Sequence, residues 1–171
     1  MKIIQTHQFI VQDLFRLLDH LNEEEYVQYI SILKTSISAH VRHIIEFYQC
    51  FFNQLDGDHI CYDRRARDKE IETSKEKAKE ALQIMYADFE KNLADRCLKI
   101  DLNQSLDEKD STMVVSTVER ELYFLADHSV HHLAIIKIAL RFMGRDAEVF
   151  HNLGLAPATQ RFILSSKSIN Q

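Results

Sequence analysis

Two histidines four residues apart, His128 and His132, form the pattern in this sequence whose chemistry is easiest to specify. They fall between Glu119 and Met143, a stretch without Pro or Gly that we expect to be one long helix. Residues four apart on a helix lie about 6 Å apart along one face, so two such imidazoles can bind one metal ion. The alternative is a pair of packed or exposed histidines with no ligand role.

The two histidines share their helix face with apolar residues at steps of three or four, among them Leu125 and Ile135. That face should therefore point into the core. A buried imidazole left without a hydrogen-bond partner costs roughly 1–3 kcal/mol, which favours one shared ion over two rings satisfied separately. His131 lies about 100° further round the helix, so it should support the site from behind or face solvent.

A third imidazole is available upstream, and two histidines qualify. His40 aligns with Ile37 and Ile44, whereas His43 aligns with the small residues Ala39 and Cys50. Periodicity slightly favours His40 for the core, while small neighbours suit a site with open coordination positions. Three histidines from two helices would leave such positions open, as is typical of catalytic metal sites. Imidazoles bind metal only when neutral and have a reference pKa near 6.5, so affinity should fall between about pH 7 and 5.

The composition predicts long helices and few connections. The 171 residues include only three Gly and one Pro, and they are enough for one domain with a sizeable core. The net charge of −5 argues against a nucleic-acid partner, which would need clustered positive charge. No apolar run approaches a membrane span, and three cysteines without a C-x-x-C suit a reducing compartment. We therefore expect a cytoplasmic protein with no nucleic-acid and no membrane partner.

Apolar spacing predicts an all-α fold, a four-helix bundle with a small β-hairpin before the last long helix. The long helices are expected at 6–21, 36–55, 73–98 and 119–143, the last capped by Ser116 or Thr117, with a short one from 22 to 29. Alternating runs at 98–102 and 113–115 predict the hairpin. The charged run 63–70 reads as a loop or the start of a helix, and the chain closes with a short helix near 147–153 and an irregular tail.

Four apolar or amphipathic residues do not fall on the apolar faces of the four expected long helices: Tyr26, Tyr29, Ile30 and Phe150. Surplus apolar surface of this kind often marks an interface. Two-fold pairing of identical chains is the commonest arrangement of such an interface. We therefore expect a homodimer.

Several motifs carry a resemblance to a known family. His43 lies in the segment SISAHVRHIIE at 36–46, and His128-x-x-x-His132 follows 85 residues after it. With the run YDRRARD at 62–68 and GLAPAT at 154–159, these motifs resemble a bacterial branch of the DinB-like metalloprotein superfamily over almost the whole chain. The resemblance implies that residues 1–171 form one domain, an up-down-down-up four-helix bundle. It also implies that His43, not His40, joins His128 and His132 as a ligand. Phe47 departs from this branch, which often carries another histidine there.

The resemblance further implies a metal-dependent enzyme of the kind that includes thiol-S-transferases. Zinc or nickel is the expected divalent metal in a purified sample, with iron also compatible with imidazole ligands. The ion would activate a low-molecular-weight thiol by lowering its pKa. Arg64 or Arg67 would hold a carboxylate of the thiol or of the small-molecule substrate. His40, His131 and Glu46 would orient the ligands from behind.

Two other functions remain open at this point. One is a metal-dependent hydrolase that uses a bound hydroxide. The other is a non-enzymatic, stress-associated metal-binding or sensor protein, which the lack of an unambiguous acid–base residue favours. The arginines of the 63–68 run are somewhat better explained as solvated charges at the start of a helix. The sequence assigns no catalytic residue.

Overall fold

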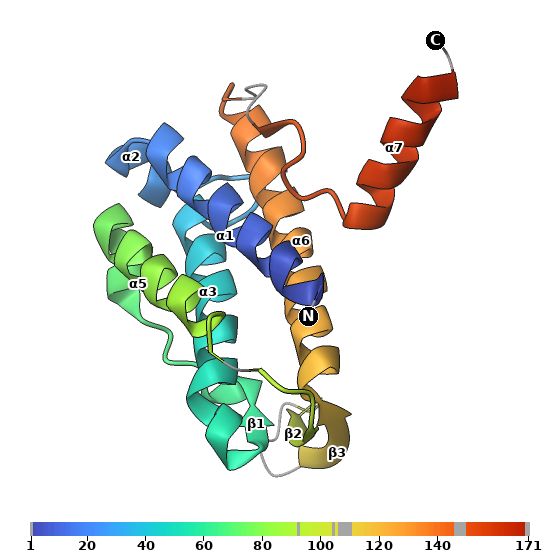
Figure 1. Ribbon diagram of the computed structural model, residues 1–171. Helices are drawn as coiled ribbons and strands as arrows, with labels where there is room; N and C mark the ends of the chain where they lie inside the picture. Colours follow the sequence, from blue (N-terminus) through green and yellow to red (C-terminus); the bar gives the residue numbers. More distant parts are fainter. Residues whose placement is uncertain (1, 92, 104, 106–110, 146–149, 170–171) are drawn as a thin grey trace.

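The computed structural model describes residues 2–91, 93–103, 105, 111–145 and 150–169. Helices dominate, as predicted, and a small sheet lies at one end (Figure 1). The helices are α1 (Lys2–His20), α2 (Glu23–Val27), α3 (Ile37–Gln54), α4 (Lys69–Thr73), α5 (Lys75–Asp88), α6 (Val118–Phe142) and α7 (Pro157–Ile169). Two 3₁₀ turns, η1 (Leu55–Gly57) and η2 (Tyr62–Arg64), and the strands β1 (His59–Cys61), β2 (Cys97–Asn103) and β3 (Ser111–Thr117) complete the elements.

The long helices enclose the main core. α1 packs against α5 and α6, and α3 packs against the same two helices (Figure 1). Each contributes buried side chains from the stripes that the spacing predicts, such as Leu14, Phe51, Leu82 and Leu125. The up-down-down-up order of the four helices stays a prediction. None of the described helices is long and apolar enough to cross a membrane.

Polar side chains decide where the two histidine-bearing helices begin. The Ser36 hydroxyl accepts the Ala39 N–H at the start of α3, and the Thr117 hydroxyl accepts the Arg120 N–H at the start of α6. Gly144, with φ of 71°, follows the end of α6 in the left-handed conformation. These helices therefore run close to the predicted bounds, and the histidines occupy regular helical positions.

The predicted hairpin is confirmed. β2 and β3 pair antiparallel, with Lys99 opposite Val115. β1 adds to the other edge of β2 in parallel, with Ile60 opposite Ile100, so the sheet order is β1-β2-β3. β1 is not among the predicted elements, because three residues are too few to show a period of two.

Two expected elements are wrong. The helix expected at 73–98 ends at Asp88, and Cys97 already belongs to β2. Phe89 and Leu93 continue the apolar stripe and are buried, but they lie beyond the helix in irregular backbone. The tail expected to be irregular forms α7, whose first residue Pro157 is pre-organised for a helical start. Of the short helix expected near 147–153, residues 147–149 lie outside the described residues, and 151–153 form a turn.

The residues expected at a dimer surface are mostly internal. Tyr26, Ile30 and Phe150 are buried in the chain's own core, and only Tyr29 is exposed. The Tyr26 hydroxyl donates to the carbonyl oxygen of Ile71 at 2.6 Å, which links α2 to α4. The apolar residues that do not lie on the buried faces of the long helices are therefore buried by the short elements that connect these helices.

The chain makes a close turn against α6 before α7 leaves the bundle (Figure 1). Gly154 has φ of 69°, and a Cβ placed there would stand 2.3 Å from the backbone nitrogen of Ala134. Only glycine fits both the conformation and the contact. α7 then projects from the body, with Phe162 and Leu164 exposed.

Candidate metal centre

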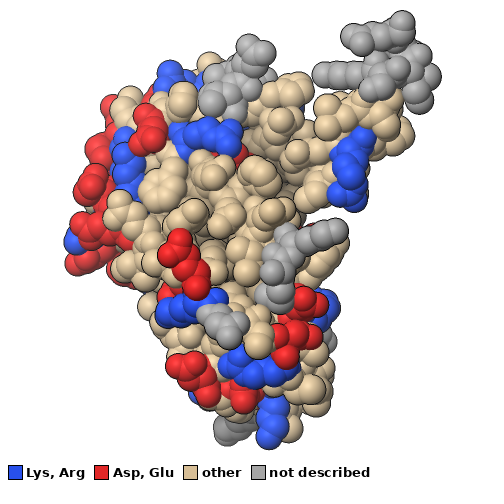
Figure 2. Space-filling model, in the orientation of Figure 1, with Lys and Arg blue, Asp and Glu red and all other residues tan. Residues whose placement is uncertain are grey.

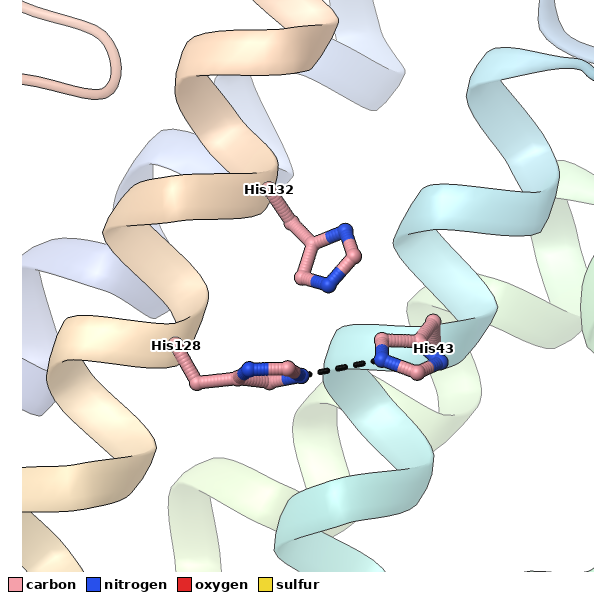
Figure 3. A group of neighbouring side chains, drawn as sticks. All are labelled: His43, His128 and His132. Carbon is pink, nitrogen blue, oxygen red and sulfur yellow. Dashed lines mark hydrogen bonds between the residues drawn. The ribbon is translucent and has the colours of Figure 1, made fainter. Parts of the chain in front are cut away.

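Three histidines converge between α3 and α6 (Figure 3). His43 comes from α3, His128 and His132 come from α6, and one ring nitrogen of each lies within 4.8 Å of the others. The Nε2 atoms of His43 and His128 are 2.9 Å apart. Two nitrogens bound to one ion at about 2.0–2.1 Å would stand about 2.8–3.4 Å apart for bond angles between 90° and 109°. The arrangement therefore fits a shared ion after small side-chain adjustments.

His40 is a partner of this group in the structure. Its Nδ1 lies 2.9 Å from Nδ1 of His132, so the hydrogen bond occupies that side of the His132 ring. Figure 3 shows the other side of the ring turned toward His43 and His128. For Nε2 of His132 to bind a metal, Nδ1 must carry the proton and donate it to His40. In that metal-bound state His40 would accept the hydrogen bond and hold the orientation of the His132 ring.

The three imidazoles are kept neutral by their surroundings. Burial lowers the pKa of His43 and of His128 to about 4, and that of His132 to about 3. Neighbouring imidazoles and the positive charge of Arg65 lower the pKa of His43 and His128 further in the same direction. Neutral imidazole is the form that binds metal, so these nitrogens are available at neutral pH and well below it.

An aromatic wall closes one side of the group. The ring centroid of Phe47 is 4.6 Å from that of His43 and 4.2 Å from that of His128. Tyr62 and Phe124 pack against Phe47 and extend this wall. The family resemblance draws attention to Phe47 only because the related branch often carries a histidine there. Helical spacing places Phe47 one turn from His43 and Phe124 one turn from His128. The wall offers no metal ligand and presents an apolar surface.

The two buried carboxylates near this region are already engaged. Glu46 accepts a hydrogen bond from the backbone N–H of Asp68, so it anchors the loop after η2 rather than an imidazole. Glu121 accepts the hydroxyl of Tyr62 at 2.9 Å and that of Ser116 at 2.6 Å. Of the residues predicted to support the ligands, His40 is hydrogen-bonded to one proposed ligand, His132. His131 is exposed, with its ring centroid 5.2 Å from that of His132.

Among the arginines of the 62–68 run, Arg65 is the one whose charge reaches the histidines. Its guanidinium carbon lies 4.3 Å from the ring centroid of Phe47, and its charge lowers the pKa of His43 and His128. Arg64 and Arg67 are exposed, and Arg67 has φ of 54°. Their role in binding substrate stays a prediction. No sequence signal separates the three arginines, because the backbone that carries them is irregular and has no period.

The family profile of the DinB superfamily matches residues 7–136. The chain belongs to the DinB superfamily. The matched region includes all three histidines and most of the helices that carry them. Searches of curated proteins and of solved structures gave no match. Membership of the DinB superfamily and the three-histidine group together fit a metal-binding protein.

Proposed function

We propose that this DinB protein is a metal-dependent enzyme that activates a low-molecular-weight thiol, with His43, His128 and His132 as the metal ligands. The observation that carries the proposal is the convergence of three neutral imidazoles from two packed helices. Within the described residues the group contains no carboxylate or thiol, so a bound ion would keep open positions. A divalent ion there, for which we propose zinc or nickel, would act as a Lewis acid that lowers the pKa of a coordinated thiol.

The engaged carboxylates favour a nucleophile that the metal ion itself activates over one that needs a separate general base. Glu46 is committed to the Asp68 N–H and Glu121 to two hydroxyls, so neither is free to act as a general base. A thiol with a lowered pKa becomes a nucleophile without such a base. The aromatic wall of Phe47 and Phe124 would meanwhile pack against the apolar part of an electrophilic partner.

The same observation also supports a second candidate, a non-enzymatic metal-binding or sensor protein. A sensor needs ligands but no acid–base group, and the described site has ligands only. The two candidates differ in whether a bound thiol reacts, which a direct assay decides.

The test begins with protein purified without a nickel column and analysed for bound metal. We expect about one divalent ion per chain, because the group offers one set of three nitrogens. The loaded protein is then mixed with a panel of thiols and electrophiles, with metal-free protein and His132→Ala as controls. Metal-dependent consumption of a thiol would support the enzyme, and stoichiometric metal without any reaction would support the sensor. Failure to bind metal would overturn both.

We also propose that the protein is a cytoplasmic homodimer. The three free thiols, Cys50, Cys61 and Cys97, suit a reducing compartment. The interface that we propose differs from the residues expected from the sequence, because α1 and α7 expose Phe9, Phe162 and Leu164. Phe9 and Leu164 line a groove of about 460 Å³ between α1, α6 and α7, and Figure 2 shows α7 standing off the uncharged surface beside it. On that face the acidic and basic side chains are interspersed, with no single basic area.

A further inference from the structure

Arg65 carries a positive charge that has no acidic partner in direct contact. One terminal nitrogen donates to the carbonyl oxygen of Tyr62 at 2.5 Å, while Nε is buried without a hydrogen-bond partner. Asp63 and Glu46 act on it electrostatically, and Arg67 opposes them, but no described carboxylate forms an ion pair with it. Since the side chain is only partly exposed, this charge is incompletely compensated by solvent.

The three-histidine group adds no negative charge to balance it. The group consists of imidazoles, which carry no negative charge, and the Glu46 carboxylate accepts the Asp68 N–H. A divalent ion held by three imidazoles would gain no negative charge from them, and Arg65 and His128 both contact the ring of Phe47. Two positive centres so close together favour an anionic ligand that touches both.

A cavity opens beside Arg65. None of the three histidines lines it, so it offers room only for the carboxylate end of a ligand. Its volume is about 280 Å³, and it is lined in part by Glu46, Gln49, Cys50, Asn53, Arg64 and Arg65. The amide and guanidinium groups supply hydrogen-bond donors for a negatively charged group. The space is sufficient for a short side chain rather than for a large cofactor.

We infer that Arg65 determines the charge of the substrate: its guanidinium binds the carboxylate of a small molecule whose thiol binds at the three-histidine group. The inference deepens the proposed function and rests on it for the thiol. It predicts a preference for short thiols with a carboxylate over thiols of equal length with a neutral or positive end. A planar guanidinium can bind both carboxylate oxygens at once, which a surface charge elsewhere cannot reproduce.

The first experiment compares 3-mercaptopropionate with 3-mercaptopropanol, which differ in charge but not in chain length. Binding of each to the zinc-loaded protein is measured by isothermal titration calorimetry. We expect the carboxylate to bind about tenfold more tightly, because hydrogen bonds to charged groups are the stronger class. Raising the salt concentration should reduce this ratio.

Variants assign the preference to one residue. Arg65→Gln should abolish the preference, so that the two thiols bind with equal affinity, while Arg65→Lys should retain part of it. Arg120→Gln removes the same charge from an exposed position at the start of α6, so it should keep the full ratio. Arg64→Gln tests the neighbouring arginine directly. If Arg64→Gln rather than Arg65→Gln abolished the preference, or if the wild-type protein showed none, the inference would be overturned.

A second experiment needs neither metal nor thiol. Acetate is titrated into the ¹⁵N-labelled metal-free protein, and the side-chain Nε–H resonance of Arg65 is followed by NMR. We expect a saturable shift that is absent for other arginines such as Arg120. If zinc or thiols fail to bind but acetate shifts Arg65, the proposed function falls and the anion site stands. If thiols bind without a charge preference and acetate leaves Arg65 unchanged, the anion site falls and the proposed function stands.

Discussion

Metal binding by this protein should be nearly independent of pH down to about pH 5.5. An imidazole with the reference pKa near 6.5 is roughly 90% protonated at pH 5.5, so three such ligands would bind about a thousandfold more weakly than at high pH. Burial lowers the pKa of His43 and His128 to about 4 and that of His132 to about 3. Each ring then stays more than about 95% neutral at pH 5.5, and affinity changes by less than about twofold.

The lowered pKa values change the pH range in which metal affinity should be lost. The loss of affinity between pH 7 and 5 belongs to solvated imidazoles, whereas desolvation by the bundle shifts it below about pH 4.5. Lowering the pH should also reduce the folding stability of the metal-free protein. Between about pH 6.5 and 4 the unfolded chain binds protons that the folded imidazoles do not, so stability falls as the pH falls through that range.

Calorimetry gives the sharpest assay. Zinc is titrated at pH 6.0 in two buffers with different ionisation enthalpies, and the difference in heat gives the number of protons released on binding. Ordinary histidines would release about two protons, whereas the lowered pKa values predict close to none. Circular dichroism at each pH serves as the control for folding. Release of about two protons, or a thousandfold loss of affinity by pH 5.5, would refute the argument from burial.

Three further predictions follow from the same structure. His132→Ala should lose stoichiometric metal while its helical circular dichroism stays intact, and full metallation of this variant would contradict the ligand assignment. His40→Ala should still bind the metal, but about 10–100-fold more weakly, as measured by chelator competition. Gly154→Ala should lower the free energy of unfolding in urea by more than about 1–3 kcal/mol, because backbone strain adds to the contact with α6. Gly144→Ala is the matched control, since it shares the positive φ but meets nothing within 4 Å, and equal losses would show that the contact costs nothing. Light scattering should give about twice the chain mass of 20.1 kDa, with Phe162→Asp shifting it to the monomer; a monomeric wild-type protein would exclude the dimer.

Local sequence determines the features that depend on a single helix. Ser36 and Thr117 cap α3 and α6, and the spacing of His128 and His132 aligns both rings on one face. These properties depend on backbone hydrogen bonds and a period of 3.6 residues, which operate within a few turns of chain. They could therefore be predicted before any packing was known.

The choice between His40 and His43 could not be made from periodicity. Both lie on the buried side of α3, three residues apart, and either could face α6. The rotation of α3 against α6 places His43 in the group of three and His40 behind His132. That rotation is set by the packing of many side chains from both helices, so it is a property of the pair and not of either sequence segment. The family resemblance favoured His43, whereas the helix pattern alone favoured His40.

Residues outside the long helices depended entirely on the tertiary structure. Arg65 reaches the site while Arg64 and Arg67 remain exposed, because Glu46 of α3 holds the backbone of the loop at Asp68. The pKa values of the histidines likewise depend on burial by segments distant in sequence. Desolvation and loop geometry arise only when the chain has folded, so the sequence alone indicated which residues could bind a metal but not the charge and acidity of the site that they form.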